Sequence, residues 1–171
     1  CSSLTVTSST TDVTCNGMCD VTATVVSSGG TGAYIYNWYG MNPSALCSGT
    51  FNYTVTDANG CTSSASVVIT EPDLISTVAS QNDISCNGFA DGSISLTIYG
   101  GTPDYTINIP PYSVPLIGGI NSFTTPSVLS AGTYSYNIID INGCVFSSSV
   151  TLMEPTPINI SAAFTEPSCY G

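Results

Sequence analysis

The stretch CNGFADGSISLTIYGGTPDY, residues 86–105, decides the fold because it holds one complete strand between two turn signals. Within it, residues 93–99 alternate polar and apolar side chains with a period of two, which is the pattern of a half-buried β-strand. Asn87-Gly88 before the strand and Gly100-Gly101 after it are turn sequences. The stretch therefore predicts an all-β protein built from short strands.

The same stretch occurs earlier in the chain. Its landmarks are Cys86, Asp91, Gly100 and Tyr105, and they match Cys15, Asp20, Gly29 and Tyr34, in the same order and at one constant spacing. Three later motifs also occur twice, now at a larger constant spacing: Gly-Thr-aromatic (49–51 and 132–134), Asp-x-Asn-Gly-Cys (57–61 and 140–144) and Glu-Pro (71–72 and 154–155). The second copy therefore carries 12 extra residues, which we place around 110–122.

The repeat predicts the domain organisation. Residues 1–72 form one unit, 73–155 form a second unit with the insertion, and 156–171 are the first strand of a truncated third. The strands expected in the second unit are 74–85, 93–99, 105–109, 122–129, 133–139 and 145–153. Asn-Gly hairpins and about seven short strands per unit are typical of immunoglobulin-like sandwiches, so we expect tandem domains of this class, arranged end to end. Tyr134 is expected to form a tyrosine corner, whereas the first copy has Phe51 there.

The composition excludes several functions. The chain has 171 residues, no Lys, Arg or His, 11 acidic residues and a formal net charge of −11. Without cationic side chains it lacks the means to bind nucleic acid. Without imidazole or amine side chains, only the small class of enzymes that use carboxylates or thiolates alone remains, so we expect no enzyme. No apolar run is long enough to insert in a membrane. Eight Cys without His indicate disulfides and an oxidising exterior, and the sequence reads as an excerpt from a longer secreted precursor.

In combination, these motifs resemble a known family. The segments 86–94, 100–105, 131–134 and 140–144 are similar to the SprB repeat of very large surface proteins of Bacteroidetes, a family named after a gliding-motility adhesin. The resemblance covers nearly the whole chain and is weaker in the first copy. It implies type IX secretion, an extracellular cell-surface location, display as filaments, and a role in attachment or gliding.

The sandwich topology restricts the disulfides. Cys15 and Cys86 fall at the bottom of their units and Cys61 and Cys144 at the top, about 25 to 35 Å away along a strand, which excludes a Cys15–Cys61 bridge. In an end-to-end array the bottom of one unit meets the top of the next. The predicted pairs are Cys15–Cys144, Cys19–Cys47 and Cys1–Cys61, with Cys86 and Cys169 pairing outside the chain with adjacent repeats or filament subunits. The alternative is that all bridges lie within single repeats.

Acidic residues also gather at the predicted junction. The four carboxylates expected there belong to Asp20, Glu71, Asp73 and Asp140. Since no cation in the sequence offsets their repulsion, they are candidate ligands of Ca²⁺, which takes six to eight oxygen ligands. The alternative is that these acids are only turn residues.

Four aromatic residues suggest a second class of function. Tyr34, Tyr36, Trp38 and Tyr39 would suit stacking against sugars, so the alternative to a structural adhesin segment is a carbohydrate-binding module that recognises surface polysaccharide. However, alternation places Tyr34, Tyr36 and Trp38 on one face, which favours a core role.

Overall fold

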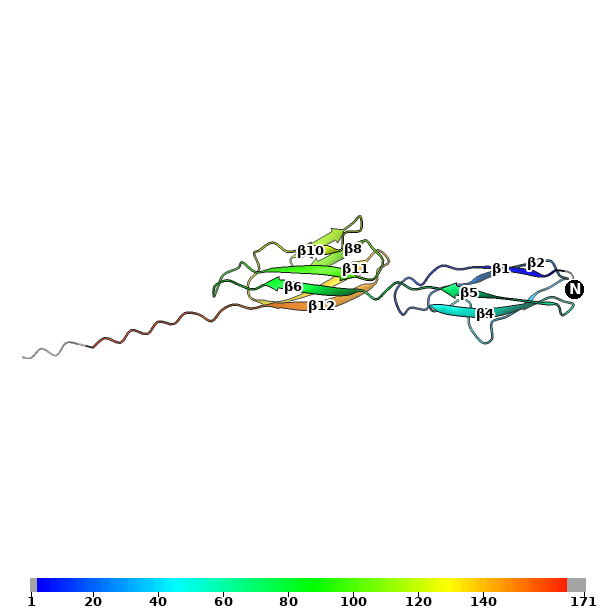
Figure 1. The fold of residues 1–171 in the computed structure, drawn as a ribbon, viewed down its shortest axis with the longest axis horizontal. Coiled ribbons are helices and arrows are strands. Elements are labelled where there is room, and N and C mark those ends of the chain that lie inside the picture. Colours follow the sequence, from blue (N-terminus) through cyan, green and yellow to red (C-terminus); the bar gives the residue numbers. More distant parts are fainter. Residues whose placement is uncertain (1–2, 166–171) are drawn as a thin grey trace, which may run out of the picture.

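The computed structural model describes residues 3–165, and within this range the chain forms twelve β-strands and no helix that would span a membrane. Two β-units lie end to end along one axis (Figure 1). The strands are β1 (Thr5–Ser9), β2 (Thr24–Ser28), β3 (Ile35–Asn37), β4 (Gly49–Thr56), β5 (Thr62–Ile69), β6 (Ser76–Asn82), β7 (Ser93–Tyr99), β8 (Tyr105–Ile109), β9 (Tyr112–Leu116), β10 (Ser122–Thr124), β11 (Gly132–Asp140) and β12 (Val145–Leu152). The all-β prediction is confirmed.

The second unit is a β-sandwich. Its strands form a three-stranded sheet, β10-β7-β6, and a four-stranded sheet, β12-β11-β8-β9, with antiparallel pairing throughout. Inward side chains of both sheets form one buried cluster that includes Ile94, Leu96, Ile107 and Ile138. The period of two read from residues 93–99 places Ile94, Leu96 and Ile98 on this inner face. The sandwich matches the sequence prediction, and its assignment as immunoglobulin-like stays a prediction.

The first unit has fewer strands and a smaller core. It has a two-stranded sheet, β1-β2, and a three-stranded sheet, β3-β4-β5. Among the described residues its core cluster contains six buried side chains, against fourteen in the second unit: Val13, Val21, Ala23, Leu46, Val67 and Ile69. The cluster is extended by Trp38 and Phe51, which pack against it.

The 12-residue insertion explains much of the difference between the units. The segment around 110–122, where we place it, contains β9, which the sequence did not predict. β9 pairs with β8 in a hairpin whose register joins Ile109 to Tyr112. Pro115 lies within β9 and removes one backbone donor, which is tolerated because β9 is an edge strand. The strand expected over 122–129 ends at Thr124, after which Leu129 forms only an isolated bridge to Gly92.

Two local predictions are confirmed. The Asn-Gly sequences lie in the hairpin turns that join β4 to β5 and β11 to β12. The Tyr134 hydroxyl donates a hydrogen bond to the carbonyl oxygen of Ser130, 2.9 Å away, which is the predicted tyrosine corner. In the first unit Phe51 packs against the core at this position and has no hydroxyl to donate.

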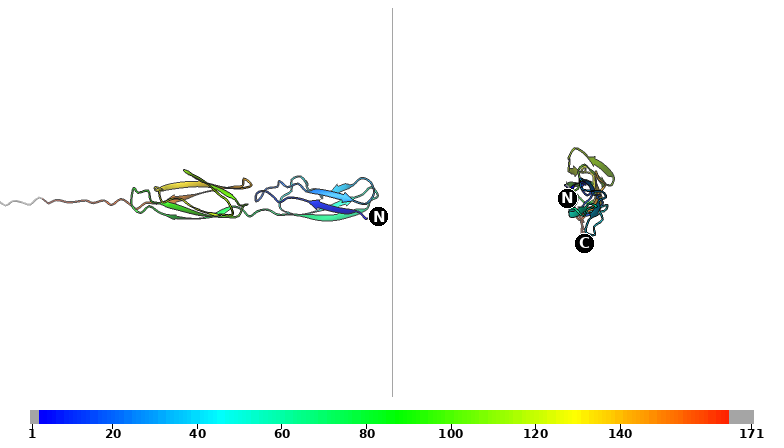
Figure 2. Two further views of the ribbon diagram at one scale, coloured as in Figure 1. Left: turned by 90° about the horizontal axis from the view of Figure 1, so that it is seen from above. Right: turned by 90° about the vertical axis from the view of Figure 1, so that its right-hand side faces the viewer.

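Residues 156–165 leave the second unit as a single extended segment (Figure 2). The rest of the predicted third-repeat strand, 166–171, lies outside the described residues. No strand is assigned to 156–165, because the segment has no ladder partner among residues 3–165. Ile158, Ile160 and Phe164 are each about 90% exposed. Ile158 follows Glu154-Pro155 at the same distance as buried Ile75 follows Glu71-Pro72, so the segment has the sequence of a first strand without the sheet that would cover it.

Candidate functional site: the junction between the units

One side of the junction is the loop that carries Cys15. One side chain and one backbone carbonyl of the segment leading out of the first unit hold this loop in place. Asn16 Nδ2 donates to the Pro72 carbonyl oxygen at 3.0 Å, and the Gly17 N–H donates to Glu71 Oε2 at 2.6 Å. The hydroxyl of Thr14 donates to Asp20, which closes the turn from its other end. The Cys-Asn-Gly motif is therefore bonded to the Glu-Pro motif by two hydrogen bonds.

The other side is the β11–β12 hairpin, which is organised by a buried carboxylate. Asp140 Oδ1 accepts backbone N–H bonds from Asn142 at 3.0 Å and Cys144 at 2.9 Å, and its Oδ2 accepts the N–H of Thr102 at 2.8 Å. Gly101 has φ +65°, and a Cβ there would lie 3.1 Å from Asp140 Oδ2 and 2.6 Å from the Ile75 side chain. Only glycine fits this position without displacing its neighbours. The Gly-Gly-Thr and Asp-x-Asn-Gly-Cys motifs thus form one loop assembly.

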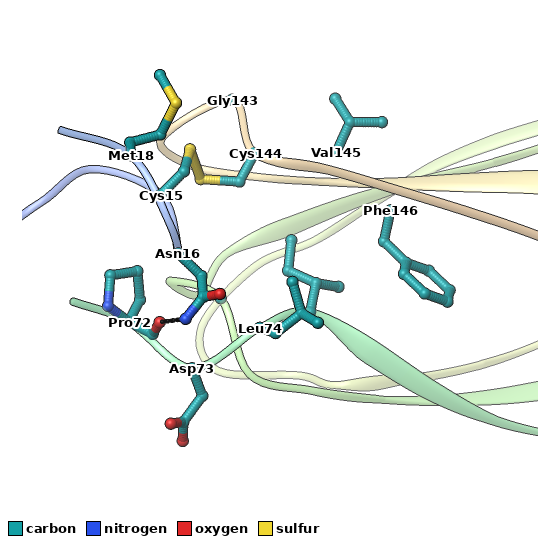
Figure 3. Close-up of a pocket in the computed structure, with 12 residues that line it drawn as sticks. Cys15, Asn16, Met18, Pro72, Asp73, Leu74, Gly143, Cys144, Val145 and Phe146 are labelled. Atoms are coloured by element: carbon teal, nitrogen blue, oxygen red, sulfur yellow. Dashed lines mark hydrogen bonds between the residues drawn. A yellow bond between two sulfur atoms is a disulfide. The ribbon is translucent and has the colours of Figure 1, made fainter. Parts of the chain in front are cut away.

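The two loops are joined covalently. Cys15 and Cys144 form a disulfide with a Cα–Cα distance of 5.6 Å (Figure 3). Beside it, Asn142 Nδ2 donates to the Thr14 carbonyl oxygen at 3.2 Å, also across the junction. A pocket of about 290 Å³ lies next to the bridge and is lined by residues of both units, including Met18, Leu74 and Phe146. The two units are therefore joined by two covalent connections, the peptide linker at Pro72 and the disulfide.

Loops equivalent to the two at the junction also lie at the outer ends of the two units. At the top of the first unit, Asp57 accepts N–H bonds from Thr31, Asn59 and Cys61 at 2.8 to 3.0 Å. The Cys61 amide, aided by those of Thr31 and Asn59, lowers the pKa of Asp57 below its ordinary value.

At the bottom of the second unit, Gly88 N–H donates to Glu154 Oε2 at 2.8 Å and Asn87 Nδ2 donates to Pro155 O at 3.1 Å. This loop presents Cys86, an exposed free thiol, where the first unit presents Cys15.

The remaining cysteines are placed as follows. Cys19 and Cys47 form a disulfide within the first unit, which is the second predicted pair. Cys61 is disulfide-bonded. Its predicted partner, Cys1, lies outside the described residues, as does Cys169. The structure thus forms the two predicted pairs whose members are both described, and Cys86 has no cysteine partner within residues 3–165.

The structure does not bring the predicted calcium ligands together. Within residues 3–165, no group of three or more acidic, Cys or His side chains is close enough to hold a metal ion. Asp20 bonds to Thr14, Glu71 to Gly17, and Asp140 to three backbone amides. The carboxylate of Asp73 points away from the disulfide (Figure 3). The carboxylates of Asp20, Glu71 and Asp140 each accept hydrogen bonds from neighbouring loop residues. This arrangement favours the alternative that these acids are turn residues.

The aromatic residues separate into different roles. Trp38 is half-buried and its ring lies 4.8 Å, centroid to centroid, from that of buried Tyr53. Tyr34 donates to the Gly29 carbonyl at 2.6 Å, as Tyr105 does to Gly100 at 2.7 Å. Tyr36 and Tyr39 are exposed. The core prediction therefore holds for Trp38 and is wrong for Tyr36, which lies on the surface, as Tyr39 does.

Sequence reasoning missed the partners that position the junction. The roles of Asn16 and Asn142 as donors, and of Glu71 as acceptor, were not predicted. The available signal was that all three belong to motifs that occur in both copies at matching offsets.

Comparison with known proteins fits this geometry. The family model described as the SprB repeat matches the chain twice, over residues 7–43 and 78–113. Each match begins within the first strand of a unit and includes the Cys-Asn-Gly loop and the Gly-Gly-Thr turn. A search of curated proteins finds no match. The chain is therefore similar to the SprB repeat, a family found in surface-exposed proteins, at two stretches, one in each β-unit.

Proposed function

We propose that the chain is a segment of an extracellular cell-surface filament, in which tandem SprB repeats act as a rod stiffened by disulfides between successive units. The observation that carries the proposal is the Cys15–Cys144 bridge, which joins the bottom of one unit to the top of the next. A peptide linker alone leaves two domains free to swing, whereas a second covalent connection removes most of that freedom.

The repeat supports extension of the same junction beyond this pair. Cys86 lies in a loop with the same hydrogen bonds as the loop of Cys15, and residues 156–165 leave the same end of the unit with the sequence of a first strand. We propose that a following repeat supplies both the cysteine that pairs with Cys86 and the sheet that covers Ile158 and Ile160. Adjacent repeats of the same filament are therefore the main partners.

The role of the filament is taken from the family resemblance and from the charge. Type IX secretion, display on the cell surface and a part in attachment or gliding are the properties that SprB repeats suggest. A chain with no Lys or Arg offers no site to trypsin-like proteases, and its net charge of −11 opposes self-association. Both properties suit a fibre that is exposed outside the cell.

The experiment compares the oxidised 171-residue chain with the Cys15→Ser/Cys144→Ser double variant by small-angle X-ray scattering. We expect the parent to give the scattering of one elongated particle, and the variant to give a broader distribution of maximum dimensions because its units are joined only by the linker. The matched control is Cys19→Ser/Cys47→Ser, measured below the melting temperature of its first unit, which removes a bridge inside one unit and should leave the angle between the units fixed. Identical distributions for the parent and the junction variant would refute the rod proposal.

The role in attachment needs a cellular test. Cells that produce the full filament with serine at the positions of Cys15 and Cys144 in this segment should adhere less firmly under flow than cells with the unchanged filament. Surface amounts of both filaments must be equal, measured with an antibody on intact cells. Equal detachment forces at equal surface amounts would contradict the mechanical role.

A further inference from the structure

A polar hollow lies on the outer face of the first unit. It has a volume of about 330 Å³ and is lined by Tyr39 and by outward-facing side chains of β4 and β5. These are Asn52 and Thr54 on β4, paired in register with Ser66 and Ser64 on β5. The Thr54 hydroxyl lies 2.6 Å from the Tyr39 hydroxyl and 2.9 Å from that of Ser64. The wall is therefore an ordered row of neutral hydroxyl and amide groups.

The second unit has a hollow at the equivalent place. It has a volume of about 530 Å³ and is lined by Ser135 and Asn137 on β11 and by Ser147 and Ser149 on β12. These four positions are the repeat equivalents of the strand positions that line the first hollow, and every one carries a hydroxyl or an amide. Pro110 lines the second hollow at the repeat position of Tyr39, so the polar floor is repeated while the aromatic wall belongs to the first unit.

Tyr39 is held in a costly conformation. Its φ is +53°, in the left-handed region that bulky residues rarely enter, and its side chain is 64% exposed. Its N–H donates to Asn37 Oδ1 at 2.9 Å, and its hydroxyl is fixed by Thr54. Strained residues that persist on a surface are characteristic of binding sites, because the surrounding structure has to hold them there.

The exposed ring stands between two hollows. On its other side lies a hollow of about 520 Å³, lined by Trp38, Met41 and Asn52 among others. Tyr39 and Asn52 line both hollows, so the ring rises between them. This arrangement offers a ligand an aromatic face flanked by hydrogen-bonding groups.

The surroundings select a neutral ligand. Residues 21–56, 58–70, 105–139 and 141–153 contain no charged side chain, and within the strands the only acid is Asp140, the last residue of β11. The other acids of the described residues lie outside the strands, so the strand faces that form these hollows carry no charge. A ligand that lies along β4 and β5 would meet hydroxyls, amides and aromatic rings, and no ionic partner.

We propose that these lateral hollows bind neutral polysaccharide, with the ring of Tyr39 stacked against a sugar face and Asn52, Ser64 and Ser66 bonded to sugar hydroxyls. Sugar hydroxyls donate and accept hydrogen bonds, as do the hydroxyls of Ser and Thr. Tyr together with Ser and Asn is a common composition of polar recognition surfaces. The hollow of the second unit, which lacks the aromatic ring, adds a second contact. Two linked sites bind a polymer more tightly than either site alone.

The test uses Trp38, the single tryptophan of the chain, as a built-in reporter beside Tyr39. Neutral hexasaccharides of glucose, mannose and N-acetylglucosamine, and an acidic hexasaccharide of hyaluronan, are titrated into the 171-residue chain. Trp38 emission and heat release are both recorded. We expect at least one neutral probe to shift the emission and release heat, and the acidic probe to give neither response.

The decisive variant is Tyr39→Gly. Glycine adopts the φ of +53° without the steric penalty that tyrosine has there, which offsets the lost hydrogen bond to Thr54, so the variant should fold while it loses the stacking ring. Its affinity for the neutral probe should fall roughly 3- to 10-fold, the worth of one aromatic contact. Tyr99→Ala, at an exposed tyrosine of the second unit, is the control and should bind as the parent does.

Three results would overturn the proposal. One is that no neutral probe changes the Trp38 emission or releases heat at millimolar concentration. Another is that Tyr39→Gly binds as tightly as the parent. The third is that hyaluronan binds as well as the neutral probes. None of these results bears on the rod, which is tested by the junction cysteines, so the two proposals fail independently.

Discussion

The hydroxyl oxygen of Tyr136 lies 2.7 Å from Oγ1 of Thr77, a hydrogen bond that joins the two sheets of the second unit. The equivalent tyrosine of the first unit, Tyr53, is fully buried, and its hydroxyl has no partner among the described residues. The reason is one substitution, since Val6 stands at the position equivalent to Thr77. A buried hydroxyl without a partner costs free energy of folding.

This difference predicts that replacing the tyrosine with phenylalanine destabilises the second unit but not the first. Tyr136→Phe should lower the free energy of unfolding of the second unit by about 1 kcal/mol, because it leaves Thr77 without its partner. Tyr53→Phe should leave the first unit unchanged or stabilise it, because it removes an unpaired hydroxyl. Chemical denaturation of the two variants measures both effects, and a loss of stability in Tyr53→Phe would show that its hydroxyl has a partner.

The disulfide inside the first unit is predicted to compensate for a small core. Cys19 and Cys47 are 28 residues apart, and a bridge of this span contributes about 3 to 4 kcal/mol by the chain-entropy estimate. Cys19→Ala/Cys47→Ala should therefore greatly lower the melting temperature of the first unit. The second unit has Ala90 and Ser130 at these positions and relies on its larger core, so its own transition should not move. Calorimetry resolves the two transitions, and equal shifts in both would contradict this assignment.

Acid is predicted to destabilise both units. The Thr14 hydroxyl lowers the pKa of Asp20, the Ser85 hydroxyl lowers that of Asp91, and the Cys61 amide lowers that of Asp57. Because the folded state favours these carboxylates, their contribution is complete above the unfolded aspartate pKa of about 3.9. It is lost as the pH falls through the lower folded values.

The matching experiment is a series of melting temperatures between neutral and strongly acidic pH. Protonation also relieves repulsion among the acids, so the informative quantity is the difference between the parent and Asp57→Asn. We expect the variant to be less stable than the parent at neutral pH and the difference to shrink in acid. A difference that does not depend on pH would contradict the role of the Asp57 carboxylate.

Removal of divalent metal is predicted to have no effect on folding. Both carboxylate oxygens of Asp140 accept backbone N–H bonds, which orient the carboxylate toward its own loop and already stabilise its charge. A chelator should leave the melting temperature of the oxidised chain unchanged, and added Ca²⁺ should not raise it. A calcium-dependent rise would show that ligands assemble in a way that residues 3–165 do not display.

The sequence predicted much of the second unit, and the reasons for its failures are local. Residues 93–99 and 105–109 alternate cleanly and form strands over those bounds. β9 was missed because Pro110, Pro111 and Pro115 break the usual strand pattern, and only the edge position of the strand makes Pro115 acceptable.

The junction was predicted in outline but not in chemistry. Placing cysteines at the top or bottom of a sandwich was enough to propose Cys15 with Cys144, because strand length separates the two ends. The same placement gathered Asp140 and Glu71 as calcium ligands. Sequence position shows which acids lie near a junction, but whether their oxygens are already bonded to backbone amides depends on loop geometry that has no signature of its own.

The loops also determine how the chain ages chemically. Asparagine followed by glycine is prone to deamidation, in which the glycine nitrogen attacks the asparagine side-chain carbon, expels ammonia and closes a succinimide that water opens to aspartate or isoaspartate. The chain has four such pairs within its described residues, at 16–17, 59–60, 87–88 and 142–143.

In all four pairs the glycine N–H is already engaged. Gly17 and Gly88 donate to Glu71 and Glu154, and the other two glycines donate to the backbone carbonyls of Asp57 and Asp140. A nitrogen held by an acceptor is not free to attack, so the folded chain should deamidate slowly. Glu71→Ala should accumulate isoaspartate at Asn16 while Asn87 stays intact, as peptide mapping after prolonged incubation would show. The hydrogen bonds that shape the junction should thereby also protect the covalent structure of the loops that form it.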